Sequence, residues 1–388
     1  MKKISYLMLA FMALCISASF TACGDDDERI VEKIVNDTVT VRDTVIVDNN
    51  WSRFQQMVNE EVMAKKKNEK AILVVAFGST WQQAFDTFDK VKSEYESEFN
   101  KQGYDVFLSF SSAICITQAA AGEHAGEGAE VRLYFDPEHW LTAFGMVGYK
   151  EIVVQSLQVI PGEEFAAVVA SVKKFMNNGY LGQAHLDDAY LAKLAEDEAI
   201  FLGMPLLNDP DVDVPAVAQQ LSTLYAAEAQ QGVVAFMGHG NPDNYDTFKA
   251  NIRYSQLEQA LQAVNPKFFV GTVDMAGNYK QDVMDRMKNK GFNSGKVYLH
   301  ALMSIAGDHA HNDMAGEGED YWDASEPESE ENSWYEFFGH NNYDPIVPVV
   351  GNHPQGLLEL PGILNVWISH TRNAEFLEDA YHSMYPEE

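Results

Sequence analysis

The stretch Tyr298-Leu-His-Ala-Leu-Met-Ser-Ile-Ala-Gly-Asp-His-Ala-His-Asn-Asp-Met-Ala315 decides the fold. It begins as an apolar run of strand length that ends at Gly307. Four ionisable residues follow the run: Asp308, His309, His311 and Asp313. In open α/β sheets, ligands bind at the carboxyl ends of the parallel strands. The stretch therefore predicts a buried strand that carries ionisable side chains into a site.

The same pattern occurs twice in the chain. Residues 148–165 align with residues 291–310, with two extra residues in the second copy, so that Glu163 and Glu164 correspond to Asp308 and His309. Earlier in each half, residues 71–79 correspond to residues 232–239, which places Ser79 opposite His239. Each half is therefore predicted to contain a strand that ends in Gly and a polar residue, then helices, then a strand that ends in Gly and two polar residues.

The alternation of strand-like and helical segments predicts the fold class. Strand, helix, strand, helix in this order indicates parallel sheets with helices on both faces. We expect an α/β fold with two similar doubly wound parallel-sheet lobes, related by internal duplication, and a cleft between them. The expected divisions are a signal peptide (1–22), an acidic and polar tether (23–50), an N-terminal lobe (51–210) and a C-terminal lobe (211–388).

The last part of the chain is predicted from local pattern. Residues 316–332 are acidic and polar, which favours a solvated loop, and their position after the His cluster leaves a lid as the alternative. Residues 345–351 are predicted as a last strand, and residues 373–384 as a closing helix.

The N-terminal sequence has the pattern of an export signal. Lys2 and Lys3 precede an apolar run over 4–20, which is too short for a membrane span with these flanks. Cys23 follows Thr-Ala, which favours a lipoprotein signal over an ordinary cleaved signal and makes Cys23 the expected lipidated residue. We expect an exported lipoprotein in the cell envelope, facing the periplasm or on the outer-membrane surface. Its membrane contact would be the lipid anchor alone.

Composition excludes one class of partner and one kind of stabilisation. The formal net charge of −31 argues against nucleic-acid binding, because phosphate contacts need Lys and Arg. With Cys15 in the signal and Cys23 acylated, Cys115 is the only thiol left, so the mature chain forms no internal disulfide. A homo-oligomer stays an open alternative.

Two histidines and one carboxylate are the candidate metal ligands. A Gly-His-Gly sequence such as that around His239 is a structural turn as often as a site. The duplication strengthens the second interpretation, because it places His239 and His309 on two strand ends of one half and Glu164 at the equivalent place in the other. Such a set suits a divalent transition metal.

The neighbouring polar residues are weaker candidates. Glu163 and Asp308 are expected either to cap the helix that follows or to orient a histidine. His311 and Asp313 are expected to be structural or to support a ligand, rather than to bind a metal directly.

Four motifs, in this order, resemble those of the anaerobic sirohydrochlorin cobaltochelatases, the single-chain (class II) chelatases of the early-cobalt route to cobalamin. The motifs lie at residues 71–79, 154–165, 236–240 and 306–315. The resemblance extends over nearly all of the mature chain. It implies a pair of similar α/β lobes with a tetrapyrrole cleft between them.

The resemblance also implies roles for residues. His239 would accept the pyrrole N–H protons, while Glu164 and His309 would help to hold Co2+ above the ring. Apart from the resemblance, the equivalence of Ser79 and His239 in the repeat makes Ser79 a candidate to hydrogen-bond a ring carboxylate. Gln158 stands where the family often has a histidine, which puts a ligand role at that position in doubt.

The expected function is insertion of Co2+ into sirohydrochlorin, with Fe2+ or Ni2+ as alternative metals and no organic cofactor. The export signal departs from the family, whose biosynthetic members are cytoplasmic. The alternatives are therefore an exported protein that binds haem, a corrinoid or a metal for uptake, or one that removes metal from a scavenged tetrapyrrole.

Overall fold

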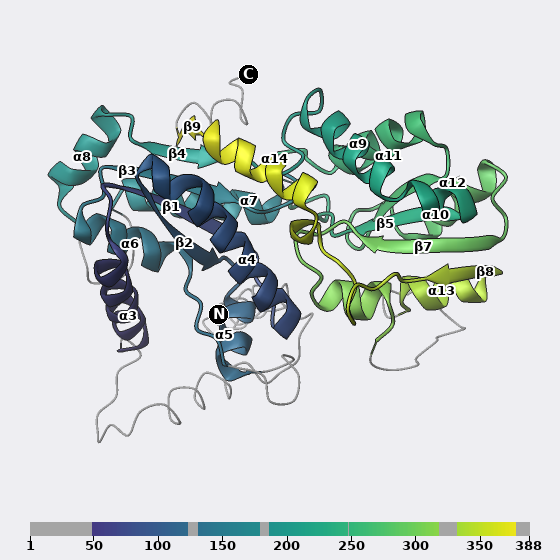
Figure 1. Ribbon diagram of the computed structural model, residues 1–388, viewed down its shortest axis with the longest axis horizontal. Coiled ribbons are helices and arrows are strands. Elements are labelled where there is room, and N and C mark those ends of the chain that lie inside the picture. The colour runs from purple at the N-terminus through teal and green to yellow at the C-terminus, as the bar shows by residue number, and fades with distance from the viewer. Residues whose placement is uncertain (1–48, 123–130, 179–185, 247, 318–331, 378–388) are drawn as a thin grey trace, which may run out of the picture. The chain divides into compact units, whose positions relative to one another are not determined.

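The computed structural model describes residues 49–122, 131–178, 186–246, 248–317 and 332–377 (Figure 1). The predicted signal peptide, Cys23 and nearly all of the predicted tether lie outside these ranges, as does most of the acidic 316–332 segment. Asp48–Glu388 forms one compact unit. None of the described helices is both long enough and apolar enough to span a membrane.

Two sheets form the core of this unit. The first has the order β2-β1-β3-β4-β9, and the second has the order β6-β5-β7-β8. Each strand pair is parallel except β4 with β9. The strand bounds are β1 Lys70–Ala76, β2 Tyr104–Phe110, β3 Glu151–Ser156, β4 Ile200–Gly203, β5 Val233–Gly238, β6 Phe268–Thr272, β7 Gly295–Ala301, β8 Tyr343–Ile346 and β9 Glu375–Phe376. The orders β2-β1-β3 and β6-β5-β7 are equivalent, and the α/β fold with two lobes is confirmed.

Helices cover both faces of each sheet. Their bounds are α3 Asn49–Lys65, α4 Gln82–Phe99, α5 Ala113–Ala121, α6 Pro137–Val147, α7 Glu163–Met176, α8 Asp188–Glu196, α9 Asp213–Leu224, α10 Ala226–Gln231, α11 Ile252–Val264, α12 Lys280–Asn289, α13 Trp334–His340 and α14 Pro361–Arg372. Local sequence sets their ends, as α6 illustrates. Asp136 accepts the His139 N–H at 3.0 Å, Pro137 occupies the first turn, and Gly148, with φ of 70°, ends the helix.

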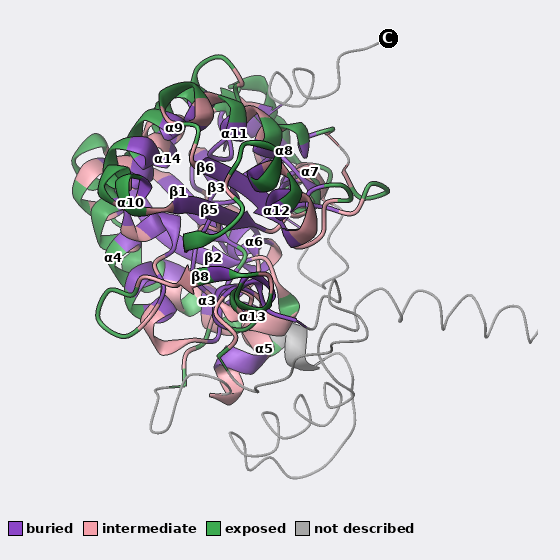
Figure 2. Ribbon diagram, turned by 90° about the vertical axis from the view of Figure 1, so that its right-hand side faces the viewer, coloured by how far each residue is buried: buried purple, intermediate pink, exposed green. Residues whose placement is uncertain are grey.

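Successive side chains of a strand point to opposite faces of the sheet, so each face packs against its own set of helices. In β1, Ile72 and Val74 face α4 and α14, whereas Leu73 and Val75 face α3, α6 and α7. The second sheet packs in the same way, with α9 and α11 on one face and α12 and α13 on the other. Figure 2 shows the buried strands inside a shell of helices with exposed outer surfaces. Strands buried on both faces are almost continuously apolar, which is why the sequence identifies them.

The prediction of a closing helix over 373–384 is wrong for residues 373–376, while Leu377 is helical and the rest of the range lies outside the described residues. Helix α14 begins at Pro361 and ends at Arg372, and Asn373 is its C-cap. The helix buries Ile363, Leu364 and Trp367, and the chain then pairs with β4 as the short strand β9. Helix α14 itself was not predicted, although the proline at its first helical position is a typical start signal. Residues 361–376, which fall within the predicted C-terminal lobe, therefore pack on the first sheet.

The predicted last strand is also shorter and earlier than expected. Strand β8 covers Tyr343–Ile346, and the chain from 347 to 350 lies outside it with Val349 and Val350 more than half exposed. An apolar run alone does not specify a strand when no neighbouring strand pairs with it.

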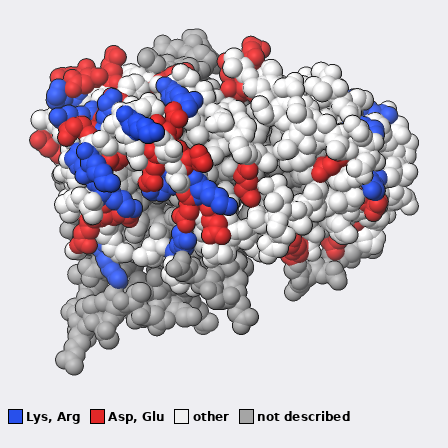
Figure 3. All heavy atoms as spheres, viewed as in Figure 1, with Lys and Arg blue, Asp and Glu red and all other residues white. Residues whose placement is uncertain are grey.

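Charged side chains of both signs are interspersed on the face seen in Figure 3. Several charged side chains among the described residues pair with each other, as Lys70 does with Glu151 at 3.0 Å and Lys174 with Glu138 at 2.8 Å. Exposed pairs of this kind contribute at most about 1 kcal/mol each, so the apolar layers hold the fold together.

Candidate functional site

The carboxyl ends of the strands supply the site residues. Ser79 follows β1, and Glu164 lies in the first turn of α7, after β3. His239 follows β5, and His309 directly precedes a π-helical turn after β7. Gly240 has φ of +81°, which lets the chain turn sharply after His239. An added Cβ there would come within 2.9 Å of the Met275 backbone nitrogen, so the turn also needs glycine for space.

His239 and His309 lie against each other. Their ring centroids are 4.8 Å apart, and the ring planes meet at 79°. Nδ1 of His239 lies 2.8 Å from the Gly240 carbonyl oxygen, and Nδ1 of His309 lies 2.5 Å from Oδ2 of Asp313. Both partners accept hydrogen bonds, so in each neutral ring Nδ1 carries the proton. Each ring therefore has the lone pair of its Nε2 available for a proton or a metal ion.

The Glu164 carboxylate lies close enough to His239 and His309 for both imidazoles to affect its pKa. Burial raises the pKa of Glu164, the two imidazoles lower it, and the charge of Asp274 raises it further, with a net increase. Burial and the charge of Glu164 likewise raise the pKa of Glu163, although Glu163 is more exposed. The three residues selected from the sequence, one carboxylate and two imidazoles from different strand ends, are thus neighbours.

Asp313 raises the pKa of His309 and orients its ring. Burial alone would lower the pKa of His309, but the hydrogen bond to Asp313 and its charge outweigh that effect, helped by Asp274 and Asp308. The net pKa is raised. A carboxylate that accepts from Nδ1 fixes the ring orientation and increases the basicity of the opposite nitrogen. Asp313 therefore orients the His309 ring, and its expected role in supporting a metal ligand stays a prediction.

Asp308 and His311 contact the first half of the chain instead. Oδ1 of Asp308 accepts the indole N–H of Trp81 at 2.5 Å. The His311 ring is buried and stacks on Trp81, with centroids 3.7 Å apart and planes 6° apart. Its two nitrogens also lie within hydrogen-bond distance of Gln83 (2.7 Å) and Glu317 (2.6 Å).

Ser79 is almost completely buried, at 4% exposure, and its Oγ accepts the Trp81 N–H at 3.3 Å. It lies opposite Gly307, where an added Cβ would be 3.3 Å from the Ser79 Oγ. The described structure therefore places Ser79 in the turn after β1, against Gly307 of the second half.

Asp274 is a site residue that the sequence reasoning missed. It follows β6, and its Oδ2 lies 3.6 Å from Nδ1 of His239. Its backbone N–H donates to the His239 carbonyl at 2.9 Å, which ties the two strand ends together. The rule that selected His239, a polar residue after a buried strand, would have found Asp274 if it had been applied to β6.

Gln158 has a structural environment. Its side chain is buried, its Oε1 accepts from the Ser156 hydroxyl, and its backbone carbonyl accepts the Trp367 indole N–H at 3.2 Å. Nε2 of Gln158 has no hydrogen-bond partner among the described residues. The side chain is thus engaged with the end of its own strand.

The trio is an open arrangement. Within the described ranges, no group of three or more His, Cys, Asp and Glu side chains is spaced so that all could hold one metal ion. Glu164, His239 and His309 are thus neighbours, but the described structure does not bring their donor atoms together around one metal position.

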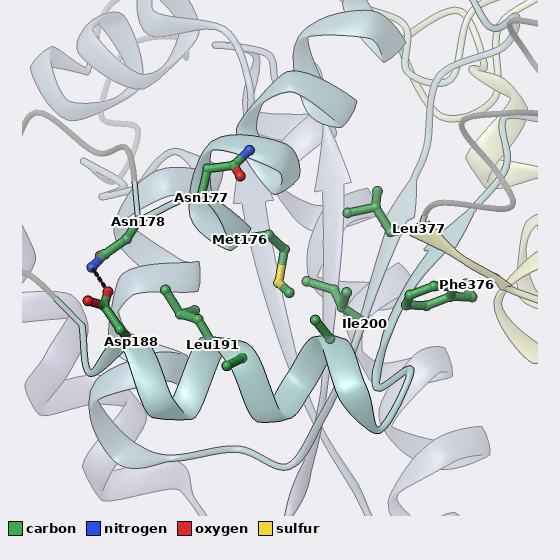
Figure 4. Close-up of a pocket in the computed structure, with 10 residues that line it drawn as sticks. Met176, Asn177, Asn178, Asp188, Leu191, Ile200, Phe376 and Leu377 are labelled. Carbon is green, nitrogen blue, oxygen red and sulfur yellow. Dashed lines mark hydrogen bonds between the residues drawn. The ribbon is translucent and has the colours of Figure 1, made fainter.

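A separate pocket lies at the other end of α7 from Glu164 (Figure 4). Its volume is about 330 Å³, and its apolar lining includes Met176, Leu191 and Phe376. Asn178 and Asp188 form a hydrogen bond of 3.0 Å at its edge. With one carboxylate and no histidine in its lining, the pocket lacks the donors that gather at the strand ends.

Comparison with known proteins identifies the family. Residues 70–375 match the model of a family described as cobalt chelatase (CbiK). The chain is 26% identical over 329 residues to sirohydrochlorin cobaltochelatase CbiKC of Nitratidesulfovibrio vulgaris. This alignment covers 84% of this chain and 96% of that protein. It is 30% identical over 261 residues to sirohydrochlorin cobaltochelatase of Salmonella typhimurium, which covers 66% and 83% respectively.

Among solved structures, SirB from Bacillus subtilis with Fe3+ matches with a TM-score of 0.44 at 15% identity, over 82% of this chain and 98% of that one. The family match spans most of the chain and includes every residue placed in the site above. The chain therefore belongs to the cobalt chelatase (CbiK) family and is a tetrapyrrole metal chelatase.

Proposed function

We propose that the protein inserts Co2+ into sirohydrochlorin. The observation that carries the proposal is the pairing of His239 and His309, each with Nδ1 engaged and Nε2 available, beside the carboxylate of Glu164. Both relatives named above are sirohydrochlorin cobaltochelatases, which supports this metal and this ring.

The reaction requires a base at the ring. Insertion forms bonds from the metal to the ring nitrogens, and two pyrrole protons leave for each divalent ion taken up. His239 suits this role, because its Nε2 accepts a proton while Gly240 holds Nδ1. Asp274, 3.6 Å from Nδ1, stabilises the resulting imidazolium. The His239 side chain is 36% exposed, so it can pass each proton to water.

The reaction also requires temporary metal ligands. Glu164 and His309 provide one oxygen and one nitrogen, a donor set that accepts Co2+, Fe2+ and Ni2+. The carboxylate offsets the charge of the ion as water leaves it, and an incomplete set lets the ion pass on to the ring. Co2+ is the proposed substrate, and no organic cofactor is needed for this chemistry.

The N-terminal sequence supports a location in the cell envelope and a second candidate function. The apolar run over 4–20 and Cys23 fit an exported lipoprotein. At that location, the same residues would serve a protein that binds haem or a corrinoid, or that removes metal from a scavenged tetrapyrrole. Removal would reverse the insertion chemistry, with the ring nitrogens taking two protons as the metal leaves.

An anaerobic absorbance assay separates these functions. Purified protein is mixed with sirohydrochlorin and Co2+, and a haem titration of the same sample runs in parallel. We expect multiple turnovers of cobalt insertion above the uncatalysed rate, lost in both His239→Ala and His309→Ala. Stoichiometric haem binding without turnover would instead establish a carrier, and release of iron from haem would establish the reverse reaction.

A further inference from the structure

We propose that Trp81 and Asn241 are equivalent positioning residues. Trp81, in the first half of the chain, fixes the segment that carries His309 of the second half. Asn241, in the second half, fixes the segment that carries Glu164 of the first half. The inference rests on the chelatase function proposed above and extends it to residues that no motif of the sequence selected.

The internal duplication makes the two residues equivalent. Ser79 and His239 occupy the same place in the two halves, and Trp81 and Asn241 each follow two residues later. The segments that they contact are also equivalent, because Asp308 and Glu163 directly precede His309 and Glu164. The contact of Trp81 with Asp308 and the contact of Asn241 with Glu163 therefore join equivalent positions of the two halves.

Trp81 holds the second-half segment through two contacts. Its Nε1–H donates to Asp308 at 2.5 Å, and its ring stacks on His311 at 3.7 Å. Gln83, in the first turn of α4, adds a contact of 2.7 Å to Nε2 of His311. His309 lies between Asp308 and His311 in the sequence, so its backbone is fixed on both sides by the first half.

Asn241 holds the first-half segment by capping α7. Gly162 occupies the N-cap position of α7 and has no side chain to satisfy the free N–H groups there. Oδ1 of Asn241 accepts the backbone N–H of Glu163 at 3.1 Å, so the second half supplies the missing cap. Glu164 is the next residue of that first turn.

The Asn241 side chain is itself rigidly held. It is 6% exposed, and Asn251 accepts both its side-chain N–H (3.2 Å) and its backbone N–H (3.0 Å). The contact with α7 is close enough to require a glycine, because a Cβ on Gly162 would lie 2.4 Å from Nδ2 of Asn241. The φ of Gly162 is −95°, so space rather than backbone conformation excludes a larger residue.

The consequence concerns the assembly of the site. Glu164 belongs to one half, and His239 and His309 belong to the other, so their spacing depends on how the halves meet. Trp81 of the first half contacts the segment next to His309, and Asn241 of the second half contacts the segment next to Glu164. These contacts fix the position of one half relative to the other at the site. A displacement of about 1 Å in such a constellation is enough to lower a rate 100-fold.

Three variants test the proposal. Trp81→Phe keeps a ring on His311 but removes the donor to Asp308. Asn241→Ala removes the cap, and Gly162→Ala displaces Asn241 without changing it. For insertion of Co2+ into sirohydrochlorin we expect kcat to fall by about 10- to 100-fold in each variant, with KM for the ring little changed, because the Trp81 Nε1–H and the Asn241 Oδ1 are already bonded within the protein.

Two matched controls separate positioning from general damage. Trp140→Phe alters a buried tryptophan whose Nε1 has no partner among the described residues. Gly339→Ala adds a Cβ that meets nothing closer than 3.8 Å. Both controls should retain the wild-type kcat per folded molecule.

Hydrogen exchange gives a readout that is independent of activity. We expect faster exchange in peptides containing Glu163 in Asn241→Ala and Gly162→Ala, and in peptides covering 307–317 in Trp81→Phe. Wild-type kcat in Trp81→Phe and Asn241→Ala would overturn the proposal, whether or not exchange changes. If the wild type inserts no cobalt, the proposed function fails instead, and unchanged exchange in all three variants would then overturn the positioning contacts by itself.

Discussion

His239 and His309 lie edge to face, with ring centroids 4.8 Å apart, although each follows a different strand of the second sheet. The contact follows from the parallel arrangement of β5 and β7, whose carboxyl ends meet at one edge. The two rings differ in the partner of Nδ1. In His239 the partner is the Gly240 carbonyl, and in His309 it is the Asp313 carboxylate. A carbonyl supports the proposed base, and a carboxylate supports the proposed ligand.

Replacing His239 by alanine should abolish insertion and leave the fold intact. We expect the rate to fall by about 100- to 10,000-fold, which is the usual contribution of a general base. The side chain is 36% exposed and lies in a turn, so the melting temperature should change little. The insertion assay and thermal unfolding check both parts. His340→Ala, on the exposed end of α13, is the control, and full activity in His239→Ala would remove that residue from the mechanism.

Replacing Glu164 by glutamine should weaken the use of metal. The variant keeps the shape of the side chain but cannot offset the charge of Co2+. We expect kcat/KM for Co2+ to fall about 100-fold. Rates measured across a range of Co2+ concentrations test this expectation. Glu163→Gln should have a smaller effect, because that side chain is more exposed, and equal losses in the two variants would contradict the ligand role of Glu164.

Replacing Asp313 by asparagine should weaken the contribution of His309. The substitution removes the charge that raises the pKa of His309 and increases the basicity of its Nε2. Loss of such a supporting carboxylate typically costs 10- to 100-fold in metal affinity or activity, and about 10-fold is expected here. The same Co2+ titration measures it. An effect as large as that of His309→Ala would mean that Asp313 itself binds the metal.

The His370–Asp213 contact should make stability depend on pH. Burial alone would lower the pKa of His370, but the hydrogen bond to Asp213 at 3.0 Å and its charge, with the Met204 and Pro205 carbonyls, raise it above its ordinary value of 6.5. A raised folded-state pKa means that the folded state binds the proton more tightly. The stabilisation is therefore fully present below about pH 6.5 and is lost as pH rises through the folded-state pKa.

Denaturant unfolding of the wild type and of His370→Gln across this pH range measures the effect. The difference in the free energy of unfolding between the two should be larger at low pH and shrink as pH rises. His340→Gln provides the matched control. A difference that grows with pH would contradict the assignment.

The sequence predicted the strand ends well because the fold is duplicated. Buried parallel strands are continuously apolar, and a repeat of the same pattern fixes which polar residues are equivalent. Glu164, His239 and His309 were found in this way, and they prove to be neighbours. Their roles in binding metal and protons stay predictions for the experiments above.

The contacts between the halves could not be predicted in the same way. Trp81 and Asn241 follow turns and belong to no apolar period, and each meets its partner only because the two halves pack together. Asp274 follows β6, a strand that lies outside the duplicated motifs by which the other site residues were selected. Helix α14 could have been predicted from a local signal, since Pro361 occupies its first position.

The return of the chain to the first sheet has a consequence for synthesis. Strand β9 pairs with β4, the Trp367 indole donates to the Gln158 carbonyl at 3.2 Å, and the Thr371 hydroxyl donates to Gln155 at 2.8 Å. During translation, the edge of the first sheet at β4 therefore stays unpaired, and one of its faces stays partly uncovered, until residues 361–376 have been made. The first sheet is thus completed by a segment that is synthesised after all strands of the second sheet.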